Sequence, residues 1–169
     1  MPRLKFIVRG RVWKLGDDVN TDLIIPGPYL TLGDMDLLAS HVLEEAIPNF
    51  AKDVKPGDII VAGKNFGCGS SREIAPALLK HLKVGAVVAE SFARIFFRNA
   101  INIGLPLMEC KDISRRVKQN QQLEINIVLG EVRNLSTGET YKGTRLPDFL
   151  LEVMEAGGAL EALKRKIVK

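Results

Sequence analysis

Two short stretches of the chain, residues 59–62 and 86–89, are apolar at every position. Continuous apolar runs of this length are typical of strands that are covered on both faces of a parallel sheet. Between them, residues 72–82 place four apolar side chains at helical spacing, which predicts a helix. A strand, a helix and a second strand in this order predict a right-handed βαβ unit at the centre of the fold.

The segments on either side of this unit follow the pattern of strands with one buried face. Apolar and polar residues alternate in 6–14 and again in 123–128. Two further strands, over 131–135 and 139–142, are separated by turn residues and predict an antiparallel meander. A short strand over 105–108 contains a proline, which is expected either at an edge of the sheet or at the start of a strand.

Residues that favour helix starts or helix ends predict several helices. Asp34 is placed to cap a helix that ends before the next proline, and Ser91 to cap a helix over 92–102. A helix over 149–156 is broken by two glycines, and a short helix closes the chain. Residues 16–28 are rich in Asp, Asn, Gly and Pro and predict a loop.

Length and composition agree with an ordinary globular protein. The chain has 169 residues, of which 46% are hydrophobic and 26% charged, enough for one domain with its own core. We predict a single α/β domain over residues 1–169, with a central βαβ core and flanking antiparallel strands. No apolar run approaches the ~20 residues that cross a bilayer, and no signal peptide follows the first residues. A cytoplasmic protein without a membrane partner is expected.

The formal net charge of +4 suits a small anionic substrate or an acidic partner. Much of the basic charge lies in 115–118 and 164–166, interpreted as a solvated loop and a solvated helix end. Aromatic residues are few, and none is interleaved with these basic runs as a base-stacking surface would require. A nucleic-acid partner is therefore not expected.

The chain contains two cysteines, Cys68 and Cys110. Two thiols cannot hold an iron–sulfur cluster or a structural zinc, since those sites use three or four ligands. We therefore expect no metal bound by this chain and two reduced thiols. Because Cys68 lies in a glycine-rich motif with cationic neighbours, a redox-sensitive thiol at that position is a further hypothesis.

The loop over residues 63–72 has the composition of an anion site. It follows a predicted strand and precedes a predicted helix, so backbone N–H groups and the helix dipole point toward one place. Ser70 and Ser71 add hydroxyl groups, and Arg72 adds a guanidinium suited to binding a carboxylate through two hydrogen bonds. The alternative is that Ser70 only caps the helix and that Arg72 is a solvated residue of its first turn.

Two common phosphate-binding motifs do not fit this loop. A P-loop requires a lysine followed by Ser or Thr after its glycines, whereas the only nearby lysine, Lys64, lies before them. A dinucleotide fingerprint requires a third glycine where Arg72 stands, although Glu90 falls where a ribose-binding acid would be expected. The loop therefore indicates an anion site of another kind.

Three segments together carry a resemblance to a known family. They are Asp17-Asp18-Val19-Asn20-Thr21-Asp22 with Ile24-Ile25-Pro26, then Asn65-Phe66-Gly67-Cys68-Gly69-Ser70-Ser71-Arg72-Glu73, then Ser91-Phe92-Ala93-Arg94-Ile95-Phe96-Phe97-Arg98-Asn99. In this order they resemble the swivel domain of the aconitase superfamily, and the match covers most of residues 8–110. The length is similar to that of the free-standing small subunit in isopropylmalate isomerase and homoaconitase.

The resemblance implies a swivelling β/β/α fold and a hydro-lyase that works only with a large subunit. That partner would carry a [4Fe-4S] cluster, and this chain would close over a hydroxy-dicarboxylate substrate. Ser70 would be the base that removes the carbon-bound proton, and Ser71 and Arg72 would hold a substrate carboxylate. Asp22 would belong to the acid–base network; the alternative is an Asx-turn residue.

Two arginines of the third segment, Arg94 and Arg98, share one face of the predicted helix. They are placed to contact the large subunit or the ligand pocket, or simply to lie at the surface. Three phenylalanines in the same segment have the spacing of core residues, and His41 and His81 are interpreted as ordinary surface residues.

The loop over residues 27–33 is where members of the family meet the variable side group of the malate. Homoaconitase-type chains resemble Tyr-Leu-Arg-Thr here, and their arginine can pair with an extra carboxylate. This sequence has Thr31 and Leu32 in those places. An unpaired buried carboxylate is costly, whereas a buried isopropyl group gains about 0.8 kcal/mol per CH₂. The loop therefore favours 2-isopropylmalate, in leucine biosynthesis, over homocitrate.

Two alternatives remain open from the sequence. One is the small subunit of homoaconitase or of another substituted-malate hydro-lyase. The other is a stand-alone anion-binding module. Self-association of the chain before it meets a partner is also left open.

Overall fold

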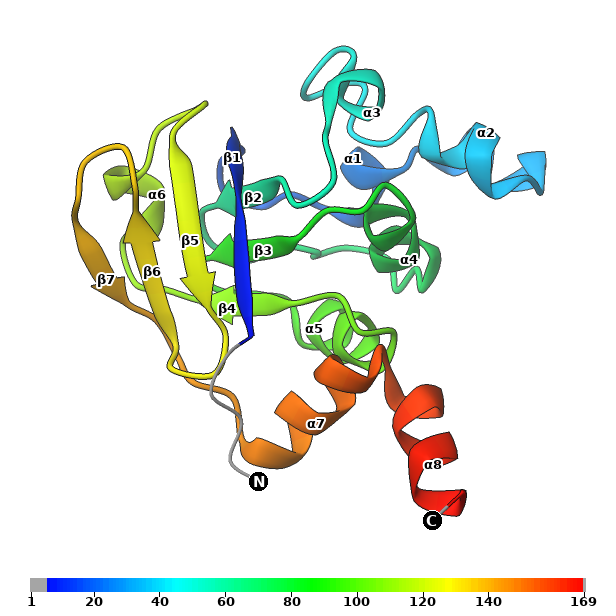
Figure 1. Ribbon diagram of the computed structural model, residues 1–169. Coiled ribbons are helices and arrows are strands. Elements are labelled where there is room, and N and C mark those ends of the chain that lie inside the picture. The colour runs from blue at the N-terminus through cyan, green and yellow to red at the C-terminus, as the bar shows by residue number, and fades with distance from the viewer. Residues whose placement is uncertain (1–5, 169) are drawn as a thin grey trace.

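The computed structural model describes residues 6–168, and within them seven strands form one sheet (Figure 1). The strands lie in the order β4-β3-β2-β1-β5-β6-β7. Their bounds are β1 Ile7–Lys14, β2 Ile59–Ala62, β3 Ala86–Ala89, β4 Leu107–Glu109, β5 Gln122–Asn126, β6 Glu131–Asn134 and β7 Thr140–Lys142. The strands β1 to β4 pair in parallel, and β1, β5, β6 and β7 pair antiparallel.

Strand β1 joins the two halves of the sheet. Its residues 7–11 pair antiparallel with β5, and its residues 12–14 pair in parallel with β2. Gly10 lies just before this change of partner, and a Cβ added there would fall 2.1 Å from the carbonyl oxygen of Gly57. The absence of a side chain at Gly10 therefore allows the turn before β2 to approach β1 closely.

Strands β2 and β3 are buried at every position, as their apolar sequences predict. Alternate side chains point into two separate cores, one on each face of the sheet. The helices α4, Ile74–His81, and α5, Arg94–Asn102, supply the first core, while α7, Asp148–Ala156, packs into the second. Coverage of both faces explains why these strands have no polar positions.

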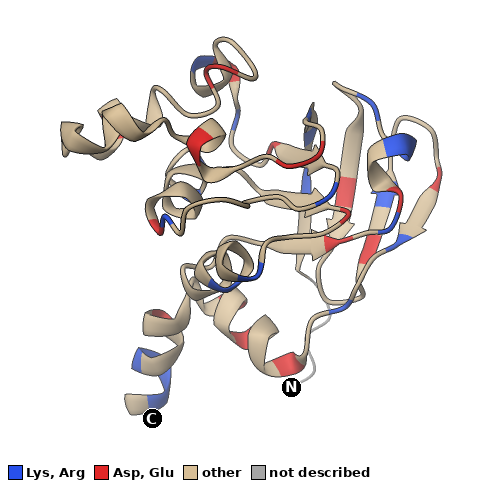
Figure 2. Cartoon of the chain, turned by 180° about the vertical axis from the view of Figure 1, so that it is seen from behind, with Lys and Arg blue, Asp and Glu red and all other residues tan. Residues whose placement is uncertain are grey.

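The remaining elements are short, apart from the last helix. They are α1 Thr21–Ile24, the 3-10 helix η1 Gly27–Leu32, α2 Met35–Ala39, α3 Phe50–Asp53, α6 Ile113–Arg116 and α8 Ala159–Ile167. None of the helices in the described part of the chain is long and apolar enough to span a membrane. Figure 2 shows basic and acidic positions interspersed over the sheet and the helices, and α8 ends in basic residues.

The strands and the antiparallel meander lie where the sequence predicts them, but the starts of two helices were predicted wrongly. Helix α4 begins at Ile74, with Glu73 at its N-cap, so Ser70 does not cap it. Helix α5 begins at Arg94 because Phe92 pairs with Phe66 in an isolated bridge. The hydroxyl of Ser91 instead accepts a hydrogen bond from the backbone N–H of Asn65, at 2.8 Å.

The segment between residues 16 and 48 also differs from the prediction. The expected loop contains the one-turn helix α1 and the first two residues of η1. Asp34 does cap α2 by accepting bonds from the next turn, but that helix ends at Ala39 rather than near residue 47. Leu43 has a φ of +56°, and its N–H donates to the carbonyl of Ile24. A residue in this left-handed conformation cannot continue a helix.

Candidate active site

Three segments that are far apart in the sequence meet beyond the ends of β1, β2 and β3. Isolated parallel bridges join Asn20 to Cys68 and Phe66 to Phe92. Their hydrogen bonds run from Thr21 N to Cys68 O (2.9 Å), Gly67 N to Val19 O (2.7 Å), Phe66 N to Ser91 O (3.0 Å) and Ala93 N to Phe66 O (2.9 Å). The glycine-rich loop therefore lies between the other two segments. These are the same three segments that carry the family resemblance in the sequence.

The conformation of the loop depends on Gly67 and on the aromatic residues beneath it. Gly67 has a φ of +85°, and a Cβ added there would lie 2.2 Å from Cγ of Phe96. Phe66 is completely buried and makes edge-on contacts with Phe92 and Phe96, at centroid distances of 5.9 and 5.2 Å. Only glycine satisfies both the left-handed backbone and this close approach.

Two of the predicted site residues, Asp22 and Arg72, meet at the end of this loop. Nη2 of Arg72 lies 2.5 Å from Oδ1 of Asp22, and Nη1 of Arg72 donates to the carbonyl of Ile25 at 2.9 Å. The hydroxyl of Thr21 donates to the carbonyl of Ser70 at 2.7 Å. The Arg72 side chain is 19% exposed and that of Asp22 is 60% exposed. The guanidinium is thus fixed in place, while its carboxylate partner faces solvent.

A hollow of about 210 Å³ lies beside these residues. Its lining includes the predicted residues Ser70, Ser71 and Arg72, and also Arg94 from the start of α5. The remaining lining residues are Thr21, Gly67, Gly69, Ala93, Ile95, Phe96 and Asn99. Two cationic side chains and two exposed serines thus face one hollow, an arrangement suited to a small dianion.

Some lining residues were missed by sequence reasoning, and some predicted residues lie elsewhere. Ile95 and Asn99 are four positions apart on α5 and share a face beside that of Arg94, but their residue types gave no signal of a site. Thr31 and Leu32 do not line the hollow; both are exposed on η1. That helix begins next to the site, since a Cβ added at Gly27 would lie 3.3 Å from Nη2 of Arg72.

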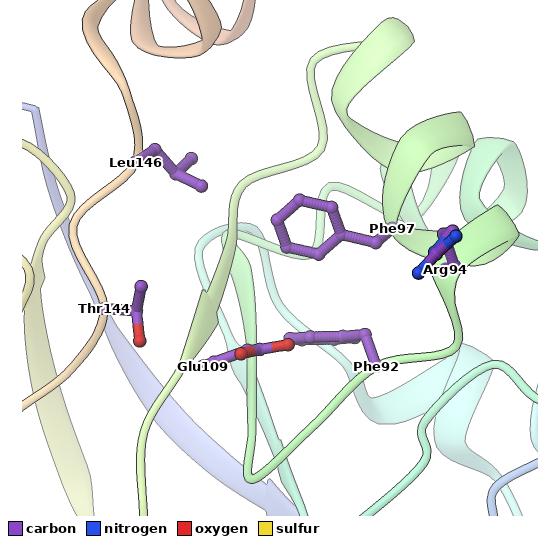
Figure 3. A pocket seen from close by; sticks show the side chains of 6 residues that line it. All are labelled: Phe92, Arg94, Phe97, Glu109, Thr144 and Leu146. Carbon is purple, nitrogen blue, oxygen red and sulfur yellow. The ribbon is translucent and has the colours of Figure 1, made fainter.

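Arg94 also lines another cavity, of about 280 Å³ (Figure 3). Figure 3 shows the rings of Phe92 and Phe97 on one side and Thr144 and Leu146 on another, with Glu109 between them. Of the three phenylalanines expected in the core, Phe96 is fully buried, whereas Phe92 and Phe97 are partly exposed and line this cavity.

The two cysteines differ in their surroundings. Cys68 is partly exposed within the glycine-rich loop. Cys110 is buried, and the loss of solvation raises the pKa of its thiol to about 11. Among residues 6–168, no group of three or more His, Cys, Asp or Glu side chains is placed to hold a metal ion. The described side chains therefore do not provide the ligand set of an iron–sulfur cluster.

Comparison with known proteins identifies the family. The aconitase C-terminal domain matches residues 38–112. The chain is 55% identical to the isopropylmalate/citramalate isomerase small subunit of Methanocaldococcus jannaschii, over 98% of this chain and 99% of that protein. It is 54% identical to the methanogen homoaconitase small subunit of Methanothermobacter thermautotrophicus, over 90% of this chain and 88% of that protein.

A solved structure shows the same fold. The crystal structure of 3-isopropylmalate dehydratase from Methanocaldococcus jannaschii superposes with a TM-score of 0.90, at 44% identity and covering 96% of each chain. The chain therefore belongs to the aconitase C-terminal domain family, among the hydro-lyase small subunits of the 3-isopropylmalate dehydratase type. The α/β swivel-domain fold inferred from the three sequence segments is thereby confirmed.

Proposed function

We propose that this chain is the small subunit of a 3-isopropylmalate dehydratase, which isomerises 2-isopropylmalate to 3-isopropylmalate in leucine biosynthesis. The main support is that Ser70 and Arg72 line one hollow with Arg94 of a distant segment, while Asp22 pairs with Arg72 beside it. The names of its relatives support the same enzyme group but divide between isopropylmalate, citramalate and homoaconitase activities.

In this proposal the chemical role of the chain is to move a proton. The hydroxyl leaves one carbon of the malate, and Ser70 takes the proton from the neighbouring carbon to form the double bond. When water is added back, the proton and the hydroxyl exchange carbons. A serine hydroxyl is a weak base, so its deprotonated form needs nearby positive charge. Arg72 and Arg94, which line the same hollow, are placed to supply that charge.

The positive charge that would stabilise the deprotonated Ser70 hydroxyl comes from a different source than the sequence predicts. A helix start directly at Ser70 would have brought the helix dipole to its hydroxyl, but α4 begins four residues later, at Ile74. The effect of the dipole is confined to the first turn of a helix. The two arginines are therefore assigned most of the electrostatic stabilisation.

The substrate carboxylates would be held by Ser71 and Arg72, with Asp22 setting the direction of the guanidinium. Because Arg72 already donates to Ile25 and pairs with Asp22, its orientation is fixed before a ligand binds. A preoriented donor does not have to be reorganised when the substrate charge arrives.

The [4Fe-4S] cluster implied by the family would belong to the large subunit, where it would act as a Lewis acid on the substrate hydroxyl. The same resemblance implies the large-subunit partner, and the hollow of this chain presents hydroxyl groups and cations for proton transfer and anion binding. The active site would thus be completed only when the two subunits meet.

The preference for the isopropyl group rests on η1. The stretch Leu30-Thr31-Leu32 carries no charge, and it follows a segment that touches Arg72. A third carboxylate, as in homocitrate, would find no cation on this stretch. The second candidate function, homoaconitase, is kept because the relative of that name is nearly as similar to the chain as the isopropylmalate/citramalate relative.

The test is a reconstitution under oxygen-free conditions of the purified chain with large subunits of this enzyme family. Isomerisation of 2-isopropylmalate, citramalate and homocitrate is then measured. The proposal requires the highest kcat/KM for 2-isopropylmalate. A preference for homocitrate would favour the homoaconitase function, and inactivity with every large subunit would favour a stand-alone anion-binding module.

A further inference from the structure

The helix η1 is held in place by few contacts of its own. None of its residues is buried, and its N-cap residue, Pro26, makes no side-chain cap hydrogen bond. The helix ends at Gly33, which has a φ of +72°. The exposed Leu30 and Leu32 do not anchor it. Tyr29 is the hydrophobic side chain of η1 that packs against the core.

Tyr29 is engaged by two residues of the turn that follows α2. Its ring lies flat on the ring of His41, with the centroids 3.8 Å apart and the planes 8° apart. Oε2 of Glu44 lies 2.8 Å from Nδ1 of His41. The carboxylate of Glu44 also lies near the Tyr29 hydroxyl and raises the pKa of Tyr29. We call these three side chains the Tyr29–His41–Glu44 cluster, with His41 in contact with both other members.

The turn that carries His41 and Glu44 is itself fixed to the core. Val42 and Leu43 between them are completely buried, and the N–H of Leu43 donates to the carbonyl of Ile24. The next residue, Ile25, accepts the hydrogen bond of Arg72. The segment over residues 26–33 is thus pinned at its start through Arg72 and at its middle through Tyr29.

We propose that the Tyr29–His41–Glu44 cluster positions the stretch Leu30-Thr31-Leu32 and so sets how sharply the enzyme distinguishes the side groups of its malate substrates. This inference rests on the proposed function, because it assigns the cluster a role at that site. Ser70 is held by different contacts, through Thr21 and the bridge at Cys68. Loss of the cluster should therefore affect substrate choice more than proton transfer.

Two variants test the cluster, and the chain offers a matched control for each. Tyr29→Phe removes only the hydroxyl, and its control is Tyr141→Phe, whose hydroxyl donates to Glu139 at 3.0 Å. His41→Ala removes the stacked ring, and its control is His81→Ala, whose ring pairs with Asp36 at 2.7 Å. Each control removes the same kind of polar contact at a place outside the cluster.

The kinetic readout is the ratio of kcat/KM for 2-isopropylmalate to kcat/KM for citramalate in the reconstituted complex. One hydrogen bond contributes enough to change such a ratio by about threefold to tenfold. We expect Tyr29→Phe and His41→Ala to narrow the ratio by that factor, through KM, with kcat nearly unchanged. We expect the controls to keep the wild-type ratio. A ratio unchanged in both cluster variants would overturn the proposal.

A second readout uses the isolated chain and needs no activity. Thermolysin cleaves before leucines in locally opened segments, so cuts at Leu30 and Leu32, read by mass spectrometry, report the mobility of η1. The cluster variants should be cut faster there, and the controls at the wild-type rate. Equal cleavage rates in the cluster variants and the wild type would refute the positioning role of the cluster, even if the complex is active. Inactivity of the wild-type complex on both substrates would instead refute the proposed function.

Discussion

Asp22 and Arg72 are 50 positions apart in the sequence, yet their side chains meet at 2.5 Å between Oδ1 and Nη2. The pair joins the first loop of the chain to the glycine-rich loop, and Ile25 accepts a second hydrogen bond from the same guanidinium. Because the Asp22–Arg72 pair is partly exposed, it should contribute little to the free energy of unfolding even if activity depends on it. Exposed ion pairs contribute only about 0–1 kcal/mol to folding.

Asp22→Asn and Arg72→Lys should therefore reduce activity far more than stability. Lysine has a single ammonium group and cannot hold Asp22 and Ile25 in the same fixed geometry. We expect each variant to unfold within about 1 kcal/mol of the wild type, and kcat/KM to fall at least about tenfold. Urea unfolding and steady-state kinetics of the complex measure the two effects. A stability loss of several kcal/mol would show that the pair is structural.

Ser70→Ala should abolish most turnover without preventing assembly with the large subunit. Loss of a general base costs about 10²- to 10⁴-fold in rate. Because the side chain is exposed, the folded state should be little affected. Kinetics of the complex and its size by light scattering test both statements, with Ser71→Ala as the comparison. Turnover retained by Ser70→Ala would place the base elsewhere.

Gly67→Ala should destabilise the chain by more than about 2 kcal/mol, since it combines a left-handed backbone with overpacking against Phe96. Gly138 is a matched control, because its φ of +82° is similar but an added Cβ would meet nothing within 4 Å. Gly138→Ala should cost about 1 kcal/mol, the backbone contribution alone. Equal losses in urea unfolding would mean that the contact with Phe96 is easily relieved.

Cys110 should make stability sensitive to alkaline pH. Its thiol has an ordinary pKa of 9.0 that burial raises to about 11 in the folded chain. The unfolded chain therefore loses this proton first as the pH rises, so stability is unaffected below pH 9 and falls between pH 9 and 11. The difference in unfolding free energy between the wild type and Cys110→Ala should decrease over that interval. A constant difference would contradict the assignment.

The two thiols should also differ in their reaction with a thiol reagent. Cys68 is partly exposed and should be labelled in the native state, whereas Cys110 should react only on unfolding. Cys68→Ser should abolish the labelling seen in the native state. A substrate analogue added to the complex should slow the labelling of Cys68, and equal labelling with and without the analogue would count against its place beside the site.

The strands were predictable because their patterns report burial directly. The apolar runs at 59–62 and 86–89 are buried on both faces, and the alternation in β5 matches its one buried face. Local patterns were less informative about helix starts. The backbone at Phe92 is used by Phe66, a contact with a residue 26 positions away that no local pattern encodes.

The candidate site was predictable as a set of residues but not as a geometry. The resemblance of three segments named Ser70, Ser71, Arg72 and Asp22, but the pairing of Arg72 with Asp22 and the role of Asn99 in the lining follow only from the folded chain. The roles of the predicted site residues stay predictions, as do the cytoplasmic location and the absence of nucleic-acid partners; these residues are Asp22, Thr31, Leu32, Ser70, Ser71 and Arg72.

The bridges from Asn20 to Cys68 and from Phe66 to Phe92 have a consequence for how such a protein can diverge. They set the register of three chain segments at once, so an insertion or deletion in any one of them would displace the other two. The stretch after Pro26 is under no such constraint, because side chains rather than a shared register hold it. Under the proposed function, η1 can therefore change in sequence and length to suit other side groups, whereas the three segments around Ser70 can change only together.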